Sequence, residues 1–196
     1  MEEKMIEKIA KVLVSQMVEE KLIVRNRMDH YIYAFIIISE RFITVTTILI
    51  ISAILQLFIP TLFFLIFFLS LRQRTGGYHA DTFGQCYLFT ILTYIAIAKG
   101  YIFFQNHFVL WTVMVIISDL IVMTIGTLNH PNMQLNLREL KESKKLARLV
   151  ILLENSVIVI LLIVQINPVC VYFMSSAMIL CAMLLCLAKI LKQEVE

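Results

Sequence analysis

The sequence is poor in charged residues and in residues that break helices. Only 16% of its 196 residues are charged, and it contains 5 glycines and 3 prolines. A soluble domain carries about 25% charged residues, whereas disordered and collagen-like chains are rich in charge, proline or glycine. The low charge and the scarcity of glycine and proline therefore exclude an ordinary soluble enzyme, a disordered linker and a collagen-like chain.

The chain also lacks the cysteine pattern of a secreted scaffold or a metal site. Its four cysteines are Cys86, Cys170, Cys181 and Cys186, and their spacing shows no regular pairing. Disulfide frameworks are typical of small secreted chains with poor cores, so we expect free thiols. We see no metal or cofactor motif and expect neither. Residues 1–27 are charged throughout, so we expect no cleavable signal peptide.

Apolar residues are abundant instead. They make up 60% of the chain, and the mean hydropathy is +0.87. We therefore predict an all-α integral membrane protein that forms one domain over residues 1–196, with an N-terminal region (1–41) and a membrane bundle (42–190). Residues 1–27 show apolar positions at helical spacing. We predict an amphipathic helix that lies on the membrane surface or packs on the rest of the protein.

Six membrane-spanning helices are predicted from the apolar runs. Residues 42–71 contain no charge, but Gln56 and Pro60 lie at their centre, and proline breaks or kinks a helix. A bilayer core of ~30 Å needs ~20 helical residues, so we predict two short spans that form a hairpin. The six predicted spans are 42–57, 59–71, 83–103, 108–128, 147–166 and 169–190.

The distribution of basic residues predicts how these spans are oriented. All lysines and arginines except Lys99 fall within the segments 1–41, 72–82, 129–148 and 189–196. Six spans place these segments on one face of the membrane, and the positive-inside rule makes that face cytoplasmic. We therefore predict a cell-membrane protein with both termini in the cytoplasm. Membrane topology explains the clustered charge better than a nucleic-acid site does, so we expect no nucleic-acid partner.

The segment between the second and third spans carries the residues with catalytic potential. The pair Gly76–Gly77 is predicted to end the second span. Thr82 is predicted to cap the third span, with Gln85 three residues later as in a capping box. Cys86 then lies in the first turn of a helix. The helix dipole there favours anions, and hence the thiolate that a nucleophilic cysteine needs.

His79 is the predicted partner of Cys86, because an imidazole can accept the thiol proton and return it to a leaving amine. Seven residues of unbroken helix would separate the two by about 10.5 Å, so the dyad requires a loop that folds back over the helix start. Asp81 is expected to orient His79 or only to complement the helix dipole. Helix-start N–H groups, and Gln85, are candidates for oxyanion support. The alternative is a buried cysteine and an interfacial histidine without catalytic roles.

The sequence Gly76-Gly77-Tyr78-His79-Ala80, followed by Cys86, resembles the catalytic segment of the accessory gene regulator B (AgrB) family. These bacterial membrane cysteine endopeptidases process quorum-sensing peptide precursors. The resemblance extends to the size of the chain, the amphipathic N-terminus, the paired short spans, the arginines before the glycine pair and His130-Pro131-Asn132. The chain departs from the family pattern at Asn129, where the family often has an acidic residue, and at Met133-Gln134, where it often has Lys-Pro.

The resemblance implies a reaction and a partner. Cys86 attacks a peptide carbonyl of a small AgrD-like precursor peptide, the C-terminal tail departs, and the N-terminal part stays on the sulfur as a thioester. A Cys or Ser side chain of the bound peptide then closes a thiolactone or lactone ring, because an intramolecular nucleophile has a large effective concentration. The resemblance also suggests a homodimer, which would shield the short spans.

Basic residues and the glycine pair are the candidates for substrate binding. An acidic precursor tail would be attracted by a basic surface. The alternative for the basic stretch from Arg138 to Arg148 is that it sets the membrane topology and also contacts anionic lipid. The candidate residues are Arg72, Arg74, Gly76, Gly77, Arg138, Lys141, Lys144 and Lys145.

Two acidic residues, Asp119 and Glu154, fall inside predicted spans. Charges there are costly and by default indicate function. One interpretation is that both line a path in a non-proteolytic peptide transporter, in which Cys86 would be inert. The other is that Glu154, near a span end, reaches the cytoplasmic interface and that Asp119 is neutral or hydrogen-bonded within the bundle. A non-enzymatic membrane interaction protein is a further alternative. Replacing Cys86 separates these classes, because only the peptidase needs its sulfur.

Overall fold

The protein is seen in a computed structural model, which describes residues 2–78, 80, 82–129 and 135–193. Within these ranges the chain forms seven α-helices and one short 3-10 helix, with no strand, so the predicted all-α fold is confirmed. The elements are α1 (Glu2–Glu19), η1 (Arg25–Arg27), α2 (Met28–Ile54), α3 (Phe58–Thr75), α4 (Phe83–Asn106), α5 (Phe108–Ile125), α6 (Leu137–Ile163) and α7 (Pro168–Ile190).

Six helices in the described part of the chain, α2 to α7, are long and apolar enough to cross a membrane, as predicted. The boundaries of the first span differ from the prediction. Helix α2 begins at Met28 rather than at residue 42, and α1 ends at Glu19 rather than at residue 27. Glu40 and Arg41 interrupt the apolar run, but neither residue breaks a helix, so α2 continues through them. The first span is therefore longer than predicted, and α6 likewise begins before residue 147.

Several helix ends are closed by the same kind of turn. Lys21, Gln56, Gln165 and Lys192 have φ values between 53° and 59°. The N–H of the residue that follows each of them donates to the carbonyl five residues earlier, which is the Schellman motif. Gln56 lies in the turn of the predicted hairpin, although the prediction placed it inside the span 42–57. Pro60 lies in the first turn of α3, where a helix does not need its missing N–H.

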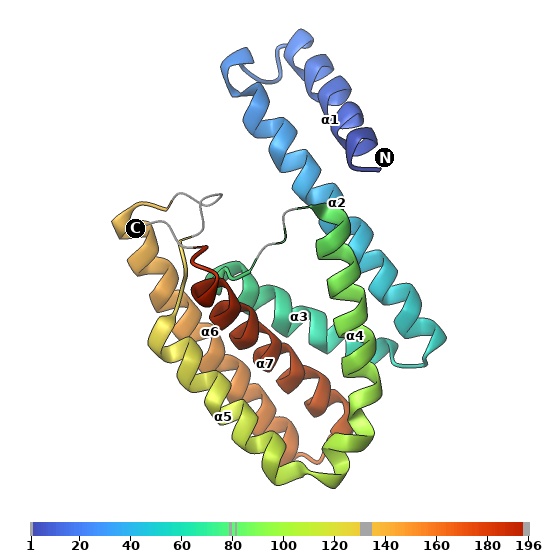
Figure 1. Cartoon of the computed structure of the whole chain (residues 1–196), viewed down its shortest axis with the longest axis vertical. Helices are drawn as coiled ribbons and strands as arrows, with labels where there is room; N and C mark the ends of the chain where they lie inside the picture. The colour runs from blue at the N-terminus through green and yellow to red at the C-terminus, as the bar shows by residue number, and fades with distance from the viewer. Residues whose placement is uncertain (1, 79, 81, 130–134, 194–196) are drawn as a thin grey trace. The chain divides into compact units, whose positions relative to one another are not determined.

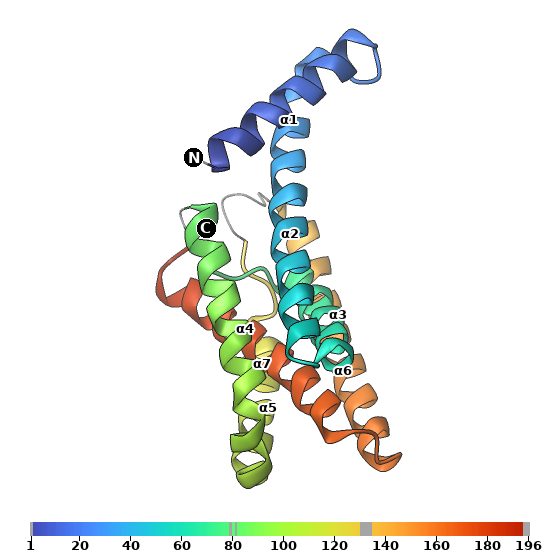
Figure 2. The same cartoon turned by 90° about the vertical axis from the view of Figure 1, so that its right-hand side faces the viewer.

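The chain divides into two compact units. The first contains residues 1–51 and 80–94. In this unit α1 folds back beside the beginning of α2 (Figures 1 and 2). Ile6, Ala10 and Val14 recur at every fourth position of α1 and are buried, whereas other apolar side chains of this helix are exposed. One apolar stripe of α1 therefore packs on the protein, whereas the position of this helix on a membrane surface stays a prediction.

The second unit contains residues 52–79 and 95–196, and α7 is its central helix. Helix α7 packs against α3, α5 and α6, and all residues from Cys170 to Ile179 are buried (Figure 1). The Tyr172 hydroxyl donates to the carbonyl of Ile97 over 2.8 Å, and the Tyr172 ring packs against Trp111 with centroids 4.8 Å apart. This packing makes α7 the framework on which neighbouring segments rest. Since α2 and α4 each run through both units, the single domain stays a prediction.

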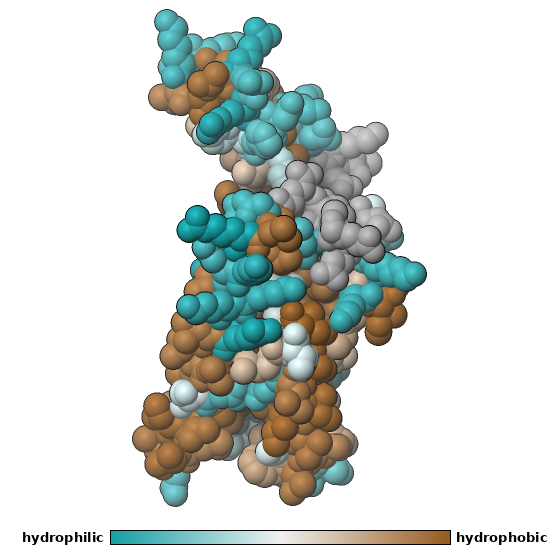
Figure 3. All heavy atoms as spheres, turned by 90° about the vertical axis from the view of Figure 1, so that its left-hand side faces the viewer, coloured by the Kyte–Doolittle hydropathy of each residue, from teal (hydrophilic) through white to brown (hydrophobic). Residues whose placement is uncertain are grey.

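The outer faces of the bundle are apolar. On α5 and α6, Val109 and Ile163 are 77% and 75% exposed. Figure 3 shows hydrophobic side chains covering the lower part of the bundle, with long hydrophilic side chains above them. Such a surface is unfavourable in water and suits the hydrocarbon core of a bilayer.

Candidate active site around Cys86 and the glycine pair

Helix α3 ends at Thr75, and the glycine pair turns the chain away, as predicted. Gly76 has φ 65°, and its N–H donates to the carbonyl of Arg72 over 3.1 Å. The Arg72 guanidinium reaches forward over this turn. One of its nitrogens donates to the carbonyl of Gly76, and the other donates to the carbonyl of Tyr78 over 2.6 Å. The helix end and the residues after it are therefore held by one side chain.

The same short segment is attached to α7. The N–H of Tyr78 donates to the carbonyl of Leu184 over 3.0 Å. Gly77 has φ 123°, and a Cβ atom placed there would lie 3.2 Å from the Leu184 carbonyl and would overlap the Arg72 guanidinium. Only glycine fits both the backbone conformation and the space. The segment Gly76–Tyr78, called the strap below, therefore has a fixed place on the α3–α7 framework.

Cys86 lies in the first turn of α4, as predicted. Its N–H donates to the carbonyl of Thr82 over 3.1 Å, and the Thr82 hydroxyl accepts a longer bond of 3.4 Å from the N–H of Gln85. Thr82 therefore caps the helix. Cys86 is exposed, and there is open space around the α-carbon of Gly84 two residues earlier. A thiol at such a helix start is accessible and is close to the positive end of the helix dipole.

The beginning of α4 is attached to α2 within the first unit. The Tyr87 hydroxyl donates to the hydroxyl of Thr47 over 3.1 Å, and the Tyr87 ring packs against Phe83. These contacts hold the turn that carries Cys86. They were not predicted, because the two hydrogen-bonded residues are 40 positions apart in the sequence.

His79 and Asp81 lie outside the described residues. The predicted dyad of His79 with Cys86 and the predicted role of Asp81 therefore stay predictions, as does oxyanion support from Gln85. Helix α3 ends at Thr75 and α4 begins at Phe83, so no continuous helix runs from α3 to Cys86. The loop that folds back over the helix start stays a prediction.

The chain that follows α5 joins the end of α3. The Thr127 hydroxyl and the Ser143 hydroxyl both donate to the carbonyl of Arg74, over 2.8 and 3.0 Å. The N–H of Leu128 donates to the carbonyl of Thr75 over 3.0 Å. The last turn of α3, the exit of α5 and the beginning of α6 therefore form one junction.

Side-chain bonds of Asn129 and Asn136 define both ends of the second loop. Asn129 both donates to and accepts from the backbone of Leu135, over 3.1 and 2.9 Å. Asn136 caps α6 in a capping box with Glu139. The departure from the family pattern at Asn129 thus has a structural role in this chain. His130-Pro131-Asn132 and Met133-Gln134 lie outside the described residues.

The predicted basic residues of α6 begin at this junction. Arg138, Lys141 and Lys145 are exposed. Lys144 is half-buried where its side chain passes Gly126. Arg138 forms an exposed ion pair with Glu142 at 3.2 Å. The structure thus brings the basic turns of α6 to the end of the bundle that also carries Arg72 and Arg74. Their role in substrate binding stays a prediction.

A polar cluster lies inside the bundle, further along α3 and α6 from this junction. The Ser70 hydroxyl of α3 donates to Glu154 of α6 over 2.6 Å, and the Asn155 side chain is hydrogen-bonded to Asp119 of α5. Glu154 is only 6% exposed, so the expectation that it reaches the cytoplasmic interface is wrong: its carboxyl is enclosed by the packed helices. Within the described part of the chain, one oxygen of Glu154 and one of Asp119 are buried without a hydrogen-bond partner. Ser70 was missed in the sequence, because a serine inside an apolar run does not indicate its partner.

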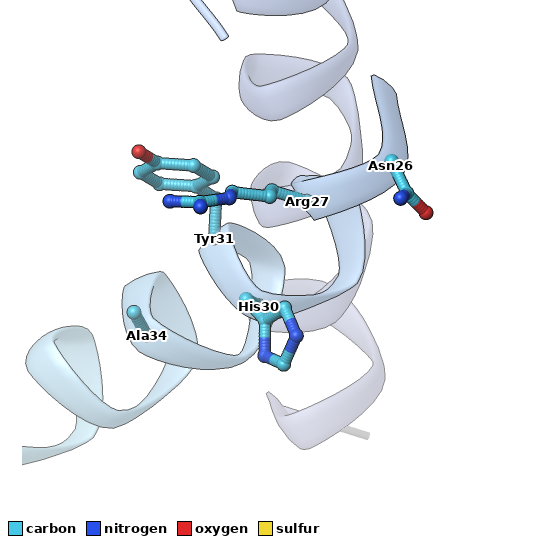
Figure 4. A pocket seen from close by; sticks show the side chains of 5 residues that line it. All are labelled: Asn26, Arg27, His30, Tyr31 and Ala34. Atoms are coloured by element: carbon cyan, nitrogen blue, oxygen red, sulfur yellow. The ribbon is translucent and has the colours of Figure 1, made fainter. Parts of the chain in front are cut away.

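Other features of the described residues do not add to this site. A shallow pocket at the beginning of α2 is lined by exposed residues, and Figure 4 shows the Arg27 side chain beneath the Tyr31 ring. It contains no residue that was predicted for catalysis. A second pocket lies between the turn at 56–60 and Asn167, at the opposite end of the bundle. Among the described residues no group of three His, Cys, Asp or Glu side chains could hold a metal ion.

Comparison with protein families decides which proteins this chain is related to. The family model described as accessory gene regulator B matches residues 6–191. This chain belongs to the AgrB family. Comparisons with curated proteins and with solved structures gave no match.

Membership of the AgrB family confirms the resemblance stated above. It makes the chain a multi-pass membrane protein of a bacterial quorum-sensing system. It also implies a cysteine endopeptidase role in processing AgrD-type peptides. The AgrB match spans all six membrane helices, so it covers both the strap and the helix that carries Cys86.

Proposed function

We propose that this AgrB protein cleaves the C-terminal tail from an AgrD-like precursor through a thioester on Cys86 and so promotes ring closure of the remaining peptide. The family match over residues 6–191 carries the proposal. The helix start supports it, because Cys86 is exposed in a capped first turn. A half-buried cysteine in the middle of an apolar helix would not be accessible to a peptide.

The proposed reaction has two steps. His79 takes the proton of the Cys86 thiol, the sulfur attacks the carbonyl before the tail, and the tail leaves as an amine after receiving that proton. A Cys or Ser side chain of the bound peptide then gives its proton to His79, attacks the thioester and displaces the Cys86 sulfur, which takes that proton back as a thiol. The second step is favoured over hydrolysis because the nucleophile is held in the same molecule and water access is limited.

The basic beginning of α6 supports a site for the precursor tail. Ser143, which lies among the basic residues, is bonded to the carbonyl of Arg74, close to the strap that leads to His79. An acidic tail on this surface would bring the preceding peptide bond near the end of α3. Charge complementarity of this kind guides association and register more than it adds affinity.

Replacement of Cys86 tests the proposal. We expect Cys86→Ala to abolish tail release when the protein is expressed with a small AgrD-like precursor. Wild-type protein should carry a precursor fragment on Cys86 that hydroxylamine removes, as a thioester requires. Mass spectrometry of the intact protein measures both. The control is Cys186→Ser, because Cys186 lies in α7 outside the proposed site and should leave tail release unchanged.

The competing transporter function makes the opposite prediction. The buried carboxyls of Asp119 and Glu154 are the observation in its favour, since charged groups within spans often mark transport paths. A transporter would move intact peptide across the membrane with Cys86→Ala as well as with the wild type. Peptide export without tail release, and unaffected by Cys86→Ala, would refute the peptidase proposal.

A further inference from the structure

We propose that Arg72 is a positioning residue for the reaction: its guanidinium fixes the strap Gly76–Tyr78 on α7 and thereby sets the backbone from which His79 extends. This inference rests on the proposed function, in which His79 is the base. It differs from the prediction made from the sequence, where Arg72 was a candidate for binding the precursor tail.

The first observation is the forked contact. A guanidinium presents its N–H groups in a planar, fixed arrangement, and here two of its nitrogens donate to the carbonyls of Gly76 and Tyr78. Hydrogen bonds from a charged donor are stronger than neutral ones. The first carbonyl belongs to the peptide group between Gly76 and Gly77, and the second belongs to the peptide group that follows Tyr78. Arg72 therefore fixes the peptide planes at both ends of the Gly77–Tyr78 pair, whereas a single bond would fix only one.

The second observation is the contact of the strap with α7. The N–H of Tyr78 donates to the carbonyl of Leu184, and Gly77 lies against the same carbonyl without room for a side chain. Since α7 is the most buried helix of the second unit, this carbonyl is a rigid reference point. Tyr78 is thus held on its N–H side by α7 and on its carbonyl side by Arg72. His79 is the next residue in the chain.

The third observation is the attachment of α3 itself. Arg72 could not position a loop if the helix that carries it were free to move. The carbonyls of Arg74 and Thr75, which follow it, accept bonds from Thr127, Ser143 and the Leu128 N–H. The base of the Arg72 side chain is therefore fixed. A catalytic base must be placed to within a fraction of an ångström, because a misplacement of about 1 Å can cost about 100-fold in rate.

Alkylation of Cys86 by iodoacetamide tests the inference without a precursor. The full-length protein in lipid nanodiscs is treated across a pH series, and the modified Cys86 peptide is measured by mass spectrometry. An imidazole within reach of the thiol accelerates alkylation at neutral pH, so His79→Ala should be slower than the wild type. If His79→Ala alkylates at the wild-type rate at every pH, the dyad is wrong and the proposed function fails with it.

If Cys86 is alkylated more slowly in His79→Ala than in the wild type, the Arg72 variants then test the inference. We expect Arg72→Gln to alkylate about 10- to 100-fold more slowly than the wild type at neutral pH. Arg72→Lys should be intermediate, because an ammonium cannot hold two carbonyls in a planar fork. Gly77→Ala should resemble Arg72→Gln, since it disturbs the same strap through a different atom. The charge control is Lys189→Gln, an exposed position on α7, which should alkylate like the wild type.

The double variant separates positioning from a general structural role. If Arg72 acts through His79, Arg72→Gln combined with His79→Ala should be no slower than His79→Ala alone. If the double variant loses alkylation rate by the product of the two single losses, Arg72 acts independently of His79. If Arg72→Gln alkylates at the wild-type rate, Arg72 does not position the base. Either result overturns the inference. If Arg72→Gln does not give folded protein, Arg72→Lys and its double variant are judged by the same comparison.

Discussion

At the scale of single residues, the glycines of this chain have different physical roles. Gly126 has φ 74°, and a Cβ atom there would lie 3.0 Å from the Lys144 side chain. Gly84 lies in the first turn of α4, where nothing is found within 4 Å of an added Cβ. One glycine is therefore required by backbone conformation and close approach, whereas the other is not.

We expect Gly126→Ala to destabilise the protein by about 1–2 kcal/mol, because a side chain in the left-handed region is strained. Gly84→Ala is the matched control and should be neutral or stabilising by up to about 1 kcal/mol, since alanine is the better helix former. Thermal unfolding of the purified protein in detergent measures both variants. Equal losses for the two variants would contradict this assignment.

At the scale of secondary-structure elements, α3, α5 and α6 share a polar interior contact. Ser70 satisfies one oxygen of Glu154, and Asn155 is hydrogen-bonded to Asp119. In the described part of the chain the remaining oxygens of the two carboxyls are buried without partners. A buried acceptor without a partner costs free energy, and a charged one costs more. The cluster therefore fixes how the three helices face each other while it lowers stability.

We expect Glu154→Gln to raise the free energy of unfolding by about 1–3 kcal/mol, the cost of a buried polar atom without a partner. The amide keeps an oxygen for the Ser70 hydroxyl, carries no charge and adds a donor that can face Asp119. The control on the same helix is Glu142→Gln, which alters an exposed ion pair and should change stability by less than about 1 kcal/mol. A lower melting temperature for Glu154→Gln would contradict the interpretation.

The sequence predicted the helices and their ends better than the contacts between them. The glycine pair and Thr82 before Cys86 are local signals, and each marks a helix boundary in the structure. The beginning of α2 was missed because charge density at Glu40 and Arg41 was read as a boundary.

Contacts between elements could not be predicted from a single sequence. The bond from Ser70 to Glu154 joins residues 84 positions apart, and the bond from Ser143 to Arg74 joins residues 69 positions apart. Local periodicity contains no information at that separation. Arg72 shows a related difficulty, because its charge suggested an external ligand, whereas its guanidinium contacts the protein's own backbone.

At the scale of the whole molecule, the distribution of charge and the six spans predict one orientation in the membrane. Arg74, Ser143 and Leu184 of the second unit lie at one end of its bundle, as the hydrogen bonds of the α3 terminus show. Gln56 and Asn167 border the pocket at the other end. Arg72, Arg74 and the basic residues of α6 lie at the first end, and basic segments are retained in the cytoplasm.

We therefore expect exposed positions at the two ends of the bundle to differ in labelling from outside the cell. In a Cys86→Ser background, His107→Cys should react with a membrane-impermeant maleimide on intact cells. Lys141→Cys should react only after the cells are opened. Both positions are exposed, so accessibility of the side chain does not limit either reaction. Labelling of Lys141→Cys on intact cells would reverse the predicted topology.

The junction at the end of α3 has a consequence for genetics. The acceptor shared by Thr127 and Ser143 is a main-chain oxygen, so no amino-acid exchange at position 74 removes it. A saturation screen would therefore detect the loss of this connection through substitutions of Thr127 and Ser143, and not through removal of the acceptor at position 74. Only substitutions of the two donor residues would reveal the importance of this connection.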